Sequence, residues 1–261
     1  MTGEDNDLSL ARDAAIEAGE ILLGHWQARD RLTVTEKRAG DFASEADLAS
    51  ERHLRARLAA ARPDDGWLGE ETGAAGTAQR RWIVDPLDGT TNFLRGIPHW
   101  AVSVTLEVEG VRTIGVIHDP LRGETFAARA GREAVLNGDP LQPSQTGQLG
   151  TALFGTGIPF GTMPHIDDHA ADIARLMPAC AGVRRMGAAA LDLAWLAAGR
   201  IDGFWERRLQ QWDIAAGLVI LRAAGVTVEG WSPDDRPETS GTVIAATPTL
   251  FGEFAAILRA A

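Results

Sequence analysis

Residues 82–93 read WIVDPLDGTTNF, and the interpretation of the whole chain starts from this stretch. Its apolar beginning predicts a short buried strand that ends in Asp85, after which Pro86 turns the chain toward Asp88. Two carboxylates at one turn offer the hard oxygen ligands that Mg²⁺ and Mn²⁺ prefer in proteins. Residues 89–91 can then present successive backbone N–H groups to a phosphate oxygen. The stretch therefore predicts a place where a metal ion and a phosphate group meet.

Three other acidic segments favour this interpretation, although each also has a purely structural explanation. Asp and Gly are common turn formers, so the spacing at 85–89 alone is equally typical of a turn without a ligand. Glu70 and Glu71 follow an apolar pair at the end of an expected strand and could instead be a solvated pair. Asp213 precedes an apolar helix, where an isolated aspartate is usually an N-cap. Ser44 and Asp47 have the spacing of a capping box.

The pattern of apolar residues changes near the middle of the chain. Before residue 148 we expect helices and mostly antiparallel strands, with helices at 8–27 and 44–61, a polar loop at 35–41, a loop of small residues at 73–79, and strands at 82–85, 101–107, 112–118 and 124–128. After it, strands at 151–156, 183–186, 201–205, 226–229 and 242–246 alternate with helices at 167–177, 188–198, 213–224 and 249–260, with a polar turn at 232–239. The fold expected is an antiparallel-rich α+β first half followed by a layered α/β second half.

Composition restricts the partners of the protein. The 261 residues carry 25 Lys and Arg against 36 Asp and Glu, and the net charge of −11 opposes binding to nucleic acid or to an anionic membrane. An acidic protein that handles anionic substrates needs bound cations. Cys180 is the single cysteine, so an internal disulfide is excluded. No secretory signal or membrane-spanning stretch is evident, and we expect a cytoplasmic protein.

Taken together, the acidic segments resemble the inositol monophosphatase family in their order and spacing. The matching motifs are DFASEAD at 41–47, GEE at 69–71, WIVDPLDGTTNF at 82–93, GAAALDLAWLAAGRIDGFWE at 187–206 and WDIAAG at 212–217. The resemblance covers nearly the whole chain. It implies an αβαβα sandwich of the sugar-phosphatase type and one phosphatase domain over residues 1–261. Within it, residues 1–147 would form a metal and phosphate half, and residues 148–261 a substrate half.

The resemblance also implies a role for each matching residue. The expected ligands of two or three Mg²⁺ ions, which Mn²⁺ could replace, are Glu70, Asp85, the carbonyl of Leu87, Asp88 and Asp213, with Asp85 bridging two ions. Asp47 and Thr90 would orient and deprotonate the attacking water, helped by Glu70 through the metal. The expected substrate contacts are Gly89, Thr90, Thr91, Arg184 or Arg185, Gly187, Ala189, Glu206 and Asp213. Two ions about 3.5 to 4 Å apart can stabilise both the attacking and the leaving oxygen.

The substrate expected from the resemblance is inositol 1-phosphate. Thr91 favours this branch, because a lysine is frequent there in relatives that act on histidinol phosphate or on nucleotides. Histidinol phosphate is the alternative substrate, followed by adenosine 3′,5′-bisphosphate and fructose 1,6-bisphosphate. A binding protein that has kept the fold without activity is the alternative from another class. Sensitivity to lithium and a homodimeric assembly are further expectations from the family.

Overall fold

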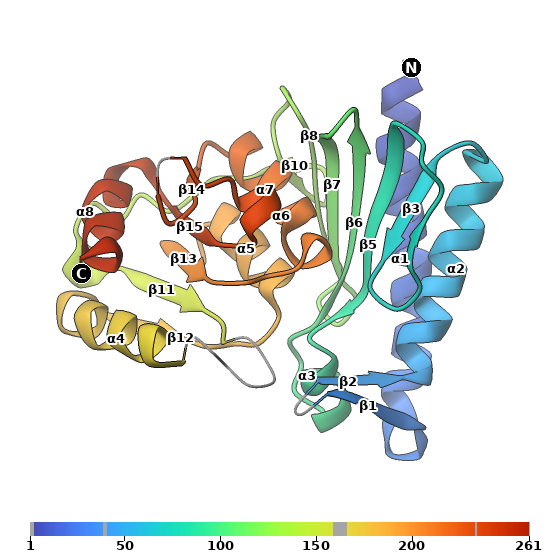
Figure 1. Cartoon of the computed structure of the whole chain (residues 1–261), viewed down its shortest axis with the longest axis horizontal. Coiled ribbons are helices and arrows are strands. Elements are labelled where there is room, and N and C mark those ends of the chain that lie inside the picture. The colour runs from blue at the N-terminus through green and yellow to red at the C-terminus, as the bar shows by residue number, and fades with distance from the viewer. Residues whose placement is uncertain (1–2, 39–40, 159–165, 233, 261) are drawn as a thin grey trace.

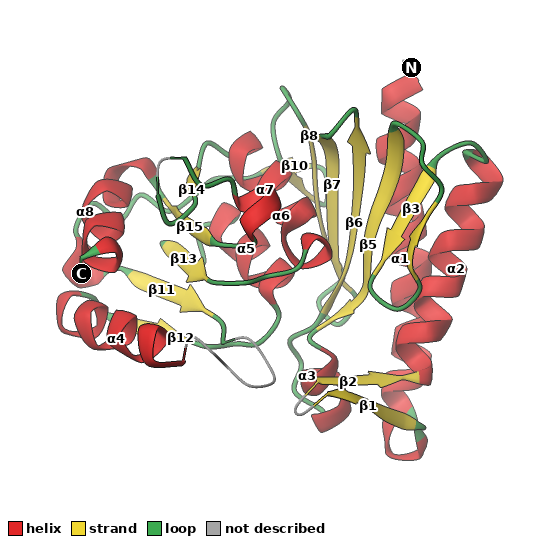
Figure 2. Ribbon diagram, viewed as in Figure 1, coloured by secondary structure: helices red, strands yellow, loops and turns green. Residues whose placement is uncertain are grey.

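Helices and β-sheets alternate in five layers in the computed structural model, which describes residues 3–38, 41–158, 166–232 and 234–260. Two helices cover the outer face of the first sheet, two lie between the sheets, and two cover the far side of the second sheet (Figures 1 and 2). In that order the pairs are α1 (Gly3–Gln27) with α2 (Glu45–Ala61), α5 (Ala189–Ala197) with α6 (Gln211–Ala223), and α4 (Ile166–Leu176) with α8 (Pro248–Arg259). The expected αβαβα sandwich is confirmed.

The first sheet has eight strands in the order β10-β9-β8-β7-β6-β5-β3-β4. Their bounds are β3 (Gly66–Gly69), β4 (Gly73–Ala75), β5 (Arg80–Asp88), β6 (Ala101–Val108), β7 (Val111–Asp119), β8 (Glu124–Arg129), β9 (Val135–Leu136) and β10 (Asp139–Pro140). All neighbours are antiparallel except β3 and β5, which are parallel. Parallel strands end at the same edge of a sheet, so the segments that follow β3 and β5 lie close together.

The second sheet has five strands in the order β12-β11-β13-β15-β14. Their bounds are β11 (Leu153–Thr156), β12 (Gly182–Arg184), β13 (Gly203–Glu206), β14 (Thr227–Glu229) and β15 (Val243–Ala246). Strand β11 pairs in parallel with both β12 and β13, whereas β15 pairs antiparallel with β13 and β14. The 3₁₀ turns are Arg29–Arg31, Leu149–Thr151 and Met177–Ala179. The strands and helices expected in this half are all present, and most of the strands are shorter than expected.

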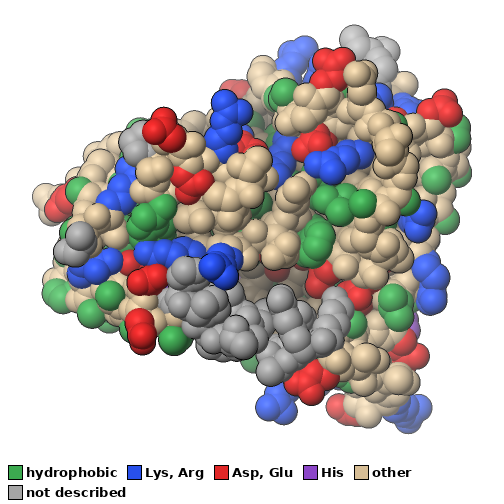
Figure 3. Space-filling model, viewed as in Figure 1, with side chains coloured by type: hydrophobic (Ala, Val, Ile, Leu, Met, Phe, Trp, Pro, Cys, Tyr) green, Lys and Arg blue, Asp and Glu red, His purple; other side chains and the backbone are tan. Residues whose placement is uncertain are grey.

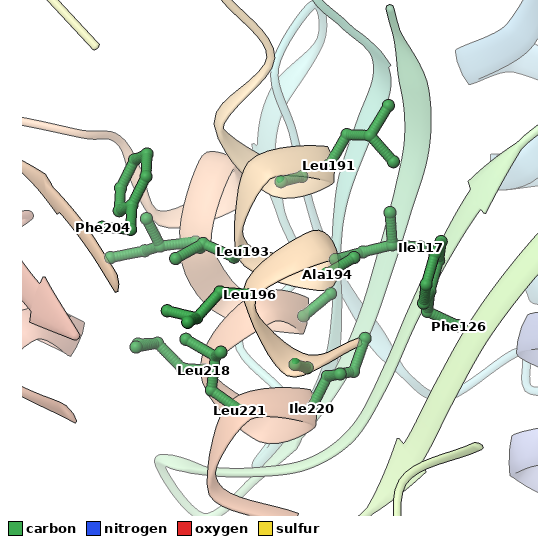
Figure 4. Packing of buried hydrophobic residues seen from close by; sticks show 14 of the residues in the cluster. Ile117, Phe126, Leu191, Leu193, Ala194, Leu196, Phe204, Leu218, Ile220 and Leu221 are labelled. Carbon is green, nitrogen blue, oxygen red and sulfur yellow. The ribbon is translucent and has the colours of Figure 1, made fainter. Parts of the chain in front are cut away.

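The central helices form a core that joins the two sheets. Figure 4 shows leucines of α5 and α6 packed between Ile117 and Phe126 of the first sheet and Phe204 of the second. Both helices are apolar on nearly every side because sheets cover them from two directions. Helices α5 and α6, whose first turns carry part of the site, are thus held by this core.

Four local predictions were wrong or incomplete. The loop expected at 35–41 contains two antiparallel strands, β1 (Val34–Arg38) and β2 (Asp41–Ser44), with residues 39–40 outside the described part. The loop expected at 73–79 begins with β4, and the turn expected at 232–239 contains the start of α7 (Pro237–Ser240), with residue 233 not described. The helix α3 (Thr90–Arg95) was not expected. These elements are short and bury few apolar side chains, so no hydrophobic period marks them.

The surface carries charges of both signs. On the face drawn in Figure 3, acidic and basic side chains are interspersed. Among the described helices, none combines the length and the apolar character needed to cross a membrane.

Candidate active site

The end of β5 has an irregular backbone. Asp85 pairs with Ser103 of β6, but Asp88 pairs with Ala101, so the register shifts between the two aspartates. The Asp85 carboxylate accepts a hydrogen bond from the backbone N–H of Leu87 at 3.0 Å, which fixes the turn. Gly89 then has a φ of 89°, and a Cβ there would lie 3.0 Å from a backbone oxygen. Backbone conformation and close packing both require glycine at this position.

Carboxylates from both halves of the chain surround one pocket, which encloses about 680 Å³ of space including its open mouth. The register places Gly69 opposite Val84, which brings Glu70 beside Asp85. The expected residues that line the pocket are Glu70, Asp85, Leu87, Asp88, Gly89, Thr90, Thr91, Arg185, Gly187, Ala189, Glu206 and Asp213. Further residues that line it are Phe42, Gly157, Ile158, Ala188, Asp192 and Leu209.

The negative charges in the pocket repel one another. Burial, followed by the charges of Glu70, Asp88 and Asp213, raises the pKa of Asp85 well above its ordinary value. Burial and the charge of Asp192 raise the pKa of Asp88 to about 7. Among the described residues, no three His, Cys, Asp or Glu side chains already converge on one point. The oxygen-rich set around the pocket nevertheless fits hard divalent cations, which would neutralise this repulsion.

Asp88 also caps a helix of the other half of the chain. Its two carboxylate oxygens accept hydrogen bonds from the backbone N–H groups of Ala189, Ala190 and Leu191, at 3.1, 2.9 and 3.3 Å. These are the first residues of α5, whose N-cap position, Ala188, has no side chain that could serve. The only trace of this role in the sequence is the absence of a local capping residue before α5.

Asp47 is both part of a cap and a partner of Thr90. The capping box expected for Ser44 and Asp47 is present, with one Asp47 oxygen 2.8 Å from the Ser44 nitrogen and 2.7 Å from its hydroxyl. The other Asp47 oxygen accepts a hydrogen bond from the Thr90 hydroxyl at 2.9 Å. Asp47 is fully buried, and this burial raises the pKa of its carboxyl. Asp47 itself lies behind the residues that line the pocket.

Asp213 does not occupy the N-cap position that an isolated aspartate would favour. Helix α6 begins at Gln211, so Gln210 is the N-cap and Asp213 is the third helical residue. Its carboxylate reaches back to the backbone N–H of Gln210 at 2.6 Å. Asp213 therefore supports the start of the helix while its side chain also lines the pocket.

Glu206 also lines the pocket, at the end of β13. Burial and the charges of Asp213 and Asp192 raise the pKa of Glu206 well above its ordinary value, whereas the charge of Arg185 lowers it. Of the two arginines considered from the sequence, Arg185 lines the pocket. Asp192 contacts His99 at 2.8 Å, a pairing that no local sequence signal announces.

Asn92 belongs to α3 and connects this helix to two loops beside the pocket. Its side-chain amide donates hydrogen bonds to the backbone oxygens of His99 and Met186, both at 2.8 Å. This role of Asn92 was not predicted, although the residue lies within the motif that carries the aspartates.

Comparisons with known proteins agree with this geometry. The model of the inositol monophosphatase family matches residues 4–261. A protein of Rhizobium meliloti named inositol-1-monophosphatase is 42% identical over 245 residues, covering 91% of this chain and 90% of the relative. A Pseudomonas aeruginosa protein named Nus factor SuhB is 40% identical over 250 residues, covering 94% and 92%.

Solved structures show the same fold. The extragenic suppressor protein SuhB of Bartonella henselae superposes with a TM-score of 0.94 at 37% identity, covering 97% of this chain and 98% of that one. An inositol monophosphatase from Anabaena gives a TM-score of 0.85 at 33% identity, covering 98% and 96%. These matches assign the chain to the phosphoric monoester hydrolases. Within that class, it belongs to the inositol monophosphatase family.

Proposed function

We propose that this enzyme hydrolyses inositol 1-phosphate to inositol and phosphate in a reaction that depends on Mg²⁺. The observation that carries the proposal is the pocket itself, which acidic side chains of both halves line together with residues 89–91 and Glu206. The acidic side chains supply ligands for cations. Residues 89–91 supply backbone N–H groups for a phosphate, and Glu206 supplies an acceptor for a hydroxyl group.

Glu70, Asp85, Asp88 and Asp213, with the carbonyl of Leu87, would hold two or three Mg²⁺ ions, for which Mn²⁺ is a substitute. The raised pKa values of Asp85 and Asp88 support this assignment, since burial and the neighbouring carboxylates both disfavour the charged forms and a bound cation would favour them. When bound, Mg²⁺ supplies Lewis acidity that stabilises charge on phosphate oxygens and lowers the pKa of water.

The proton of the attacking water would leave through Thr90 and Asp47. The Thr90 hydroxyl lies 2.9 Å from an Asp47 oxygen and 3.0 Å from the Leu87 carbonyl, and its single hydrogen can point to either. When the hydrogen points to Asp47, the Thr90 oxygen can accept a proton from water on the pocket side. Burial raises the pKa of Asp47, which makes its carboxylate a stronger base than a solvated one.

The phosphate and the leaving group would be held at opposite sides of the pocket. Thr90 and Thr91 open α3, and the first N–H groups of a helix have no acceptor within it. We assign these N–H groups, with that of Gly89, to the phosphate. Glu206 would accept a hydrogen bond from a hydroxyl of the inositol ring, with Arg185, Gly187, Ala189 and Asp213 nearby.

The test is release of inorganic phosphate from inositol 1-phosphate, with and without Mg²⁺. A panel with histidinol phosphate, adenosine 3′,5′-bisphosphate and fructose 1,6-bisphosphate identifies the preferred substrate by kcat/KM. The variant Asp85→Asn serves as the inactive control. Absence of turnover on the whole panel with Mg²⁺ present would support a binding protein that has kept the fold.

Several finer properties belong to the same proposal. Lithium should inhibit, because a small monovalent ion can occupy a Mg²⁺ position without supplying its charge. A homodimer and a cytoplasmic location are also proposed, and sedimentation and cell fractionation test them. The net charge of −11 supports the expectation that neither nucleic acid nor an anionic membrane is a direct partner, which stays a prediction.

A further inference from the structure

Gly157 and Glu206 lie next to each other on two neighbouring strands at the edge of the pocket. Strands β11 and β13 are parallel, with Thr156 opposite Trp205. The Thr156 hydroxyl donates a hydrogen bond of 2.7 Å to the Trp205 carbonyl, which holds this register where the strands end. Gly157 and Glu206 are the next residues along the two strands, and both line the pocket.

The Glu206 carboxylate occupies the space that a side chain at position 157 would need. An ideal Cβ placed on Gly157 would lie within 3.0 Å of three Glu206 atoms, the carboxylate carbon and both oxygens, closer than real Cβ atoms approach such neighbours. Residue 157 lies at the carboxyl end of a strand and is not among the glycines with positive φ. The backbone would accept alanine here, so the obstacle to a side chain is Glu206.

A side chain at position 157 could be accommodated only if the Glu206 carboxylate moved. Glu206 is only 6% exposed, and the charged groups that act on it are Asp213, Asp192, Arg185 and Asp88. Three of these four are acidic, so a displaced carboxylate would still lie among groups that repel it. A methyl group at position 157 would therefore move the carboxylate away from the place where it meets the leaving group in the proposed function.

We propose that Gly157 is a positioning residue that determines substrate specificity. Its missing side chain creates the space in which the Glu206 carboxylate stands, and that carboxylate selects leaving groups that carry a hydroxyl, as polyol phosphates do. This inference rests on the proposed function, in which Glu206 contacts the leaving group. It adds that Gly157 fixes where this contact is made.

The first experiment measures thermal unfolding of Gly157→Ala in two backgrounds, the wild type and Glu206→Ala. We expect Gly157→Ala to lower the Tm in the wild type, because the new methyl group overlaps the Glu206 carboxylate. When Glu206 is truncated this overlap is absent, and the Tm should stay unchanged or rise, because alanine reduces the conformational entropy of the unfolded chain. Gly150→Ala is the matched control, since no atom lies within 4 Å of a Cβ there and its φ is not positive. Equal Tm changes for Gly157→Ala in both backgrounds would overturn the proposal.

The second experiment compares inositol 1-phosphate with phenyl phosphate, whose leaving group has no additional hydroxyl. Loss of a hydrogen bond to a charged acceptor weakens recognition roughly tenfold or more. We expect Gly157→Ala and Glu206→Gln each to reduce the preference for inositol 1-phosphate by about this factor, mainly through KM, and the double variant to be no worse. If Glu206→Gln reduces the preference for inositol 1-phosphate and Gly157→Ala does not, the proposed role of Gly157 is overturned. An unchanged preference in Glu206→Gln instead overturns the proposed leaving-group contact, and this inference with it.

Discussion

Replacement of Asp47 by asparagine separates its role in the cap from its role toward Thr90. The side-chain oxygen of the asparagine can still accept from the Ser44 N–H and hydroxyl, which lie at 2.8 and 2.7 Å from the present carboxylate. The amide group then faces the Thr90 hydroxyl, whose hydrogen can turn to the Leu87 carbonyl at 3.0 Å. No polar group loses its partner, so we expect the free energy of unfolding to change by no more than about 1 kcal/mol.

The pH dependence gives the sign of that change. Burial raises the pKa of Asp47 above 3.8, so the folded state holds this proton more tightly than the unfolded state. The resulting stability is fully present below 3.8 and is lost as the pH rises through the folded-state pKa. At neutral pH the wild type carries the cost of a buried charge, and Asp47→Asn should be at least as stable. As the pH is lowered toward the ordinary pKa of an aspartate, the stability advantage of Asp47→Asn should disappear.

The effect on catalysis should be much larger. General-base catalysis contributes roughly 10²- to 10⁴-fold to rates, and asparagine cannot accept the proton. We therefore expect kcat to fall at least about 100-fold, which corresponds to about 2.7 kcal/mol in the activation free energy. Thr90→Ala interrupts the same path and should cause a similar loss. The double variant should be scarcely slower than either single one, because residues that act as one unit are not additive.

The assay is phosphate release at saturating Mg²⁺ for the three variants, with urea unfolding of each. Ser44→Ala is the matched control for the cap, because it removes one partner of Asp47 and leaves the carboxylate in place. It should lose about 1 kcal/mol of stability with a smaller fall in kcat than Asp47→Asn. Full activity in Asp47→Asn, or losses that multiply in the double variant, would refute the proton path and leave Asp47 as a cap.

Three further predictions concern Asp88 and the buried acids. Asp88→Ala should lower the free energy of unfolding by about 0.5–2 kcal/mol even in EDTA, because Asp88 caps α5 and alanine offers no acceptor to its first N–H groups; urea unfolding equal to that of the wild type would contradict the cap. With the pKa of Asp88 at about 7, Mg²⁺ must displace protons, so its Kd should fall as the pH rises through 7. Calorimetry in two buffers with different ionisation enthalpies should detect that release, and buffer-independent heats would argue against it. The same raised pKa implies that the metal-free protein loses stability as the pH rises from 3.8 to about 7, since over that range the folded state holds this proton more tightly than the unfolded state. Added Mg²⁺ should reverse this fall in Tm, and a Tm that rises over this range in EDTA would disprove the linkage.

The sequence could identify the acidic segments but not how they meet. The strand before Asp85 and the helix after Asp213 follow from apolar runs that any buried element requires. The proximity of Glu70 to Asp85 depends instead on the parallel pairing of β3 with β5. Pairing between strands is a property of the assembled sheet, and a single sequence carries only weak signals for it.

Roles that depend on distant partners were the ones that local patterns missed. Gly157 has an ordinary backbone conformation, and only the neighbouring strand reveals why a side chain is excluded there. Asp192 lies in an apolar helix, where its pairing with His99 has no signature in either segment. The capping box at Ser44 could be predicted because both partners lie within one turn of the chain.

Asp88 shows why the site lies at the junction of the two halves. Its oxygens accept hydrogen bonds from three N–H groups at the start of α5, so the orientation of the carboxylate is fixed before any cation binds. Those N–H groups carry partial positive charge, which offsets part of the repulsion from Asp192. A carboxylate held this way loses little conformational freedom when it becomes a ligand. The same bonds anchor α5 to the end of β5, so the contact that orients the proposed metal ligand also joins the first half of the chain to the second.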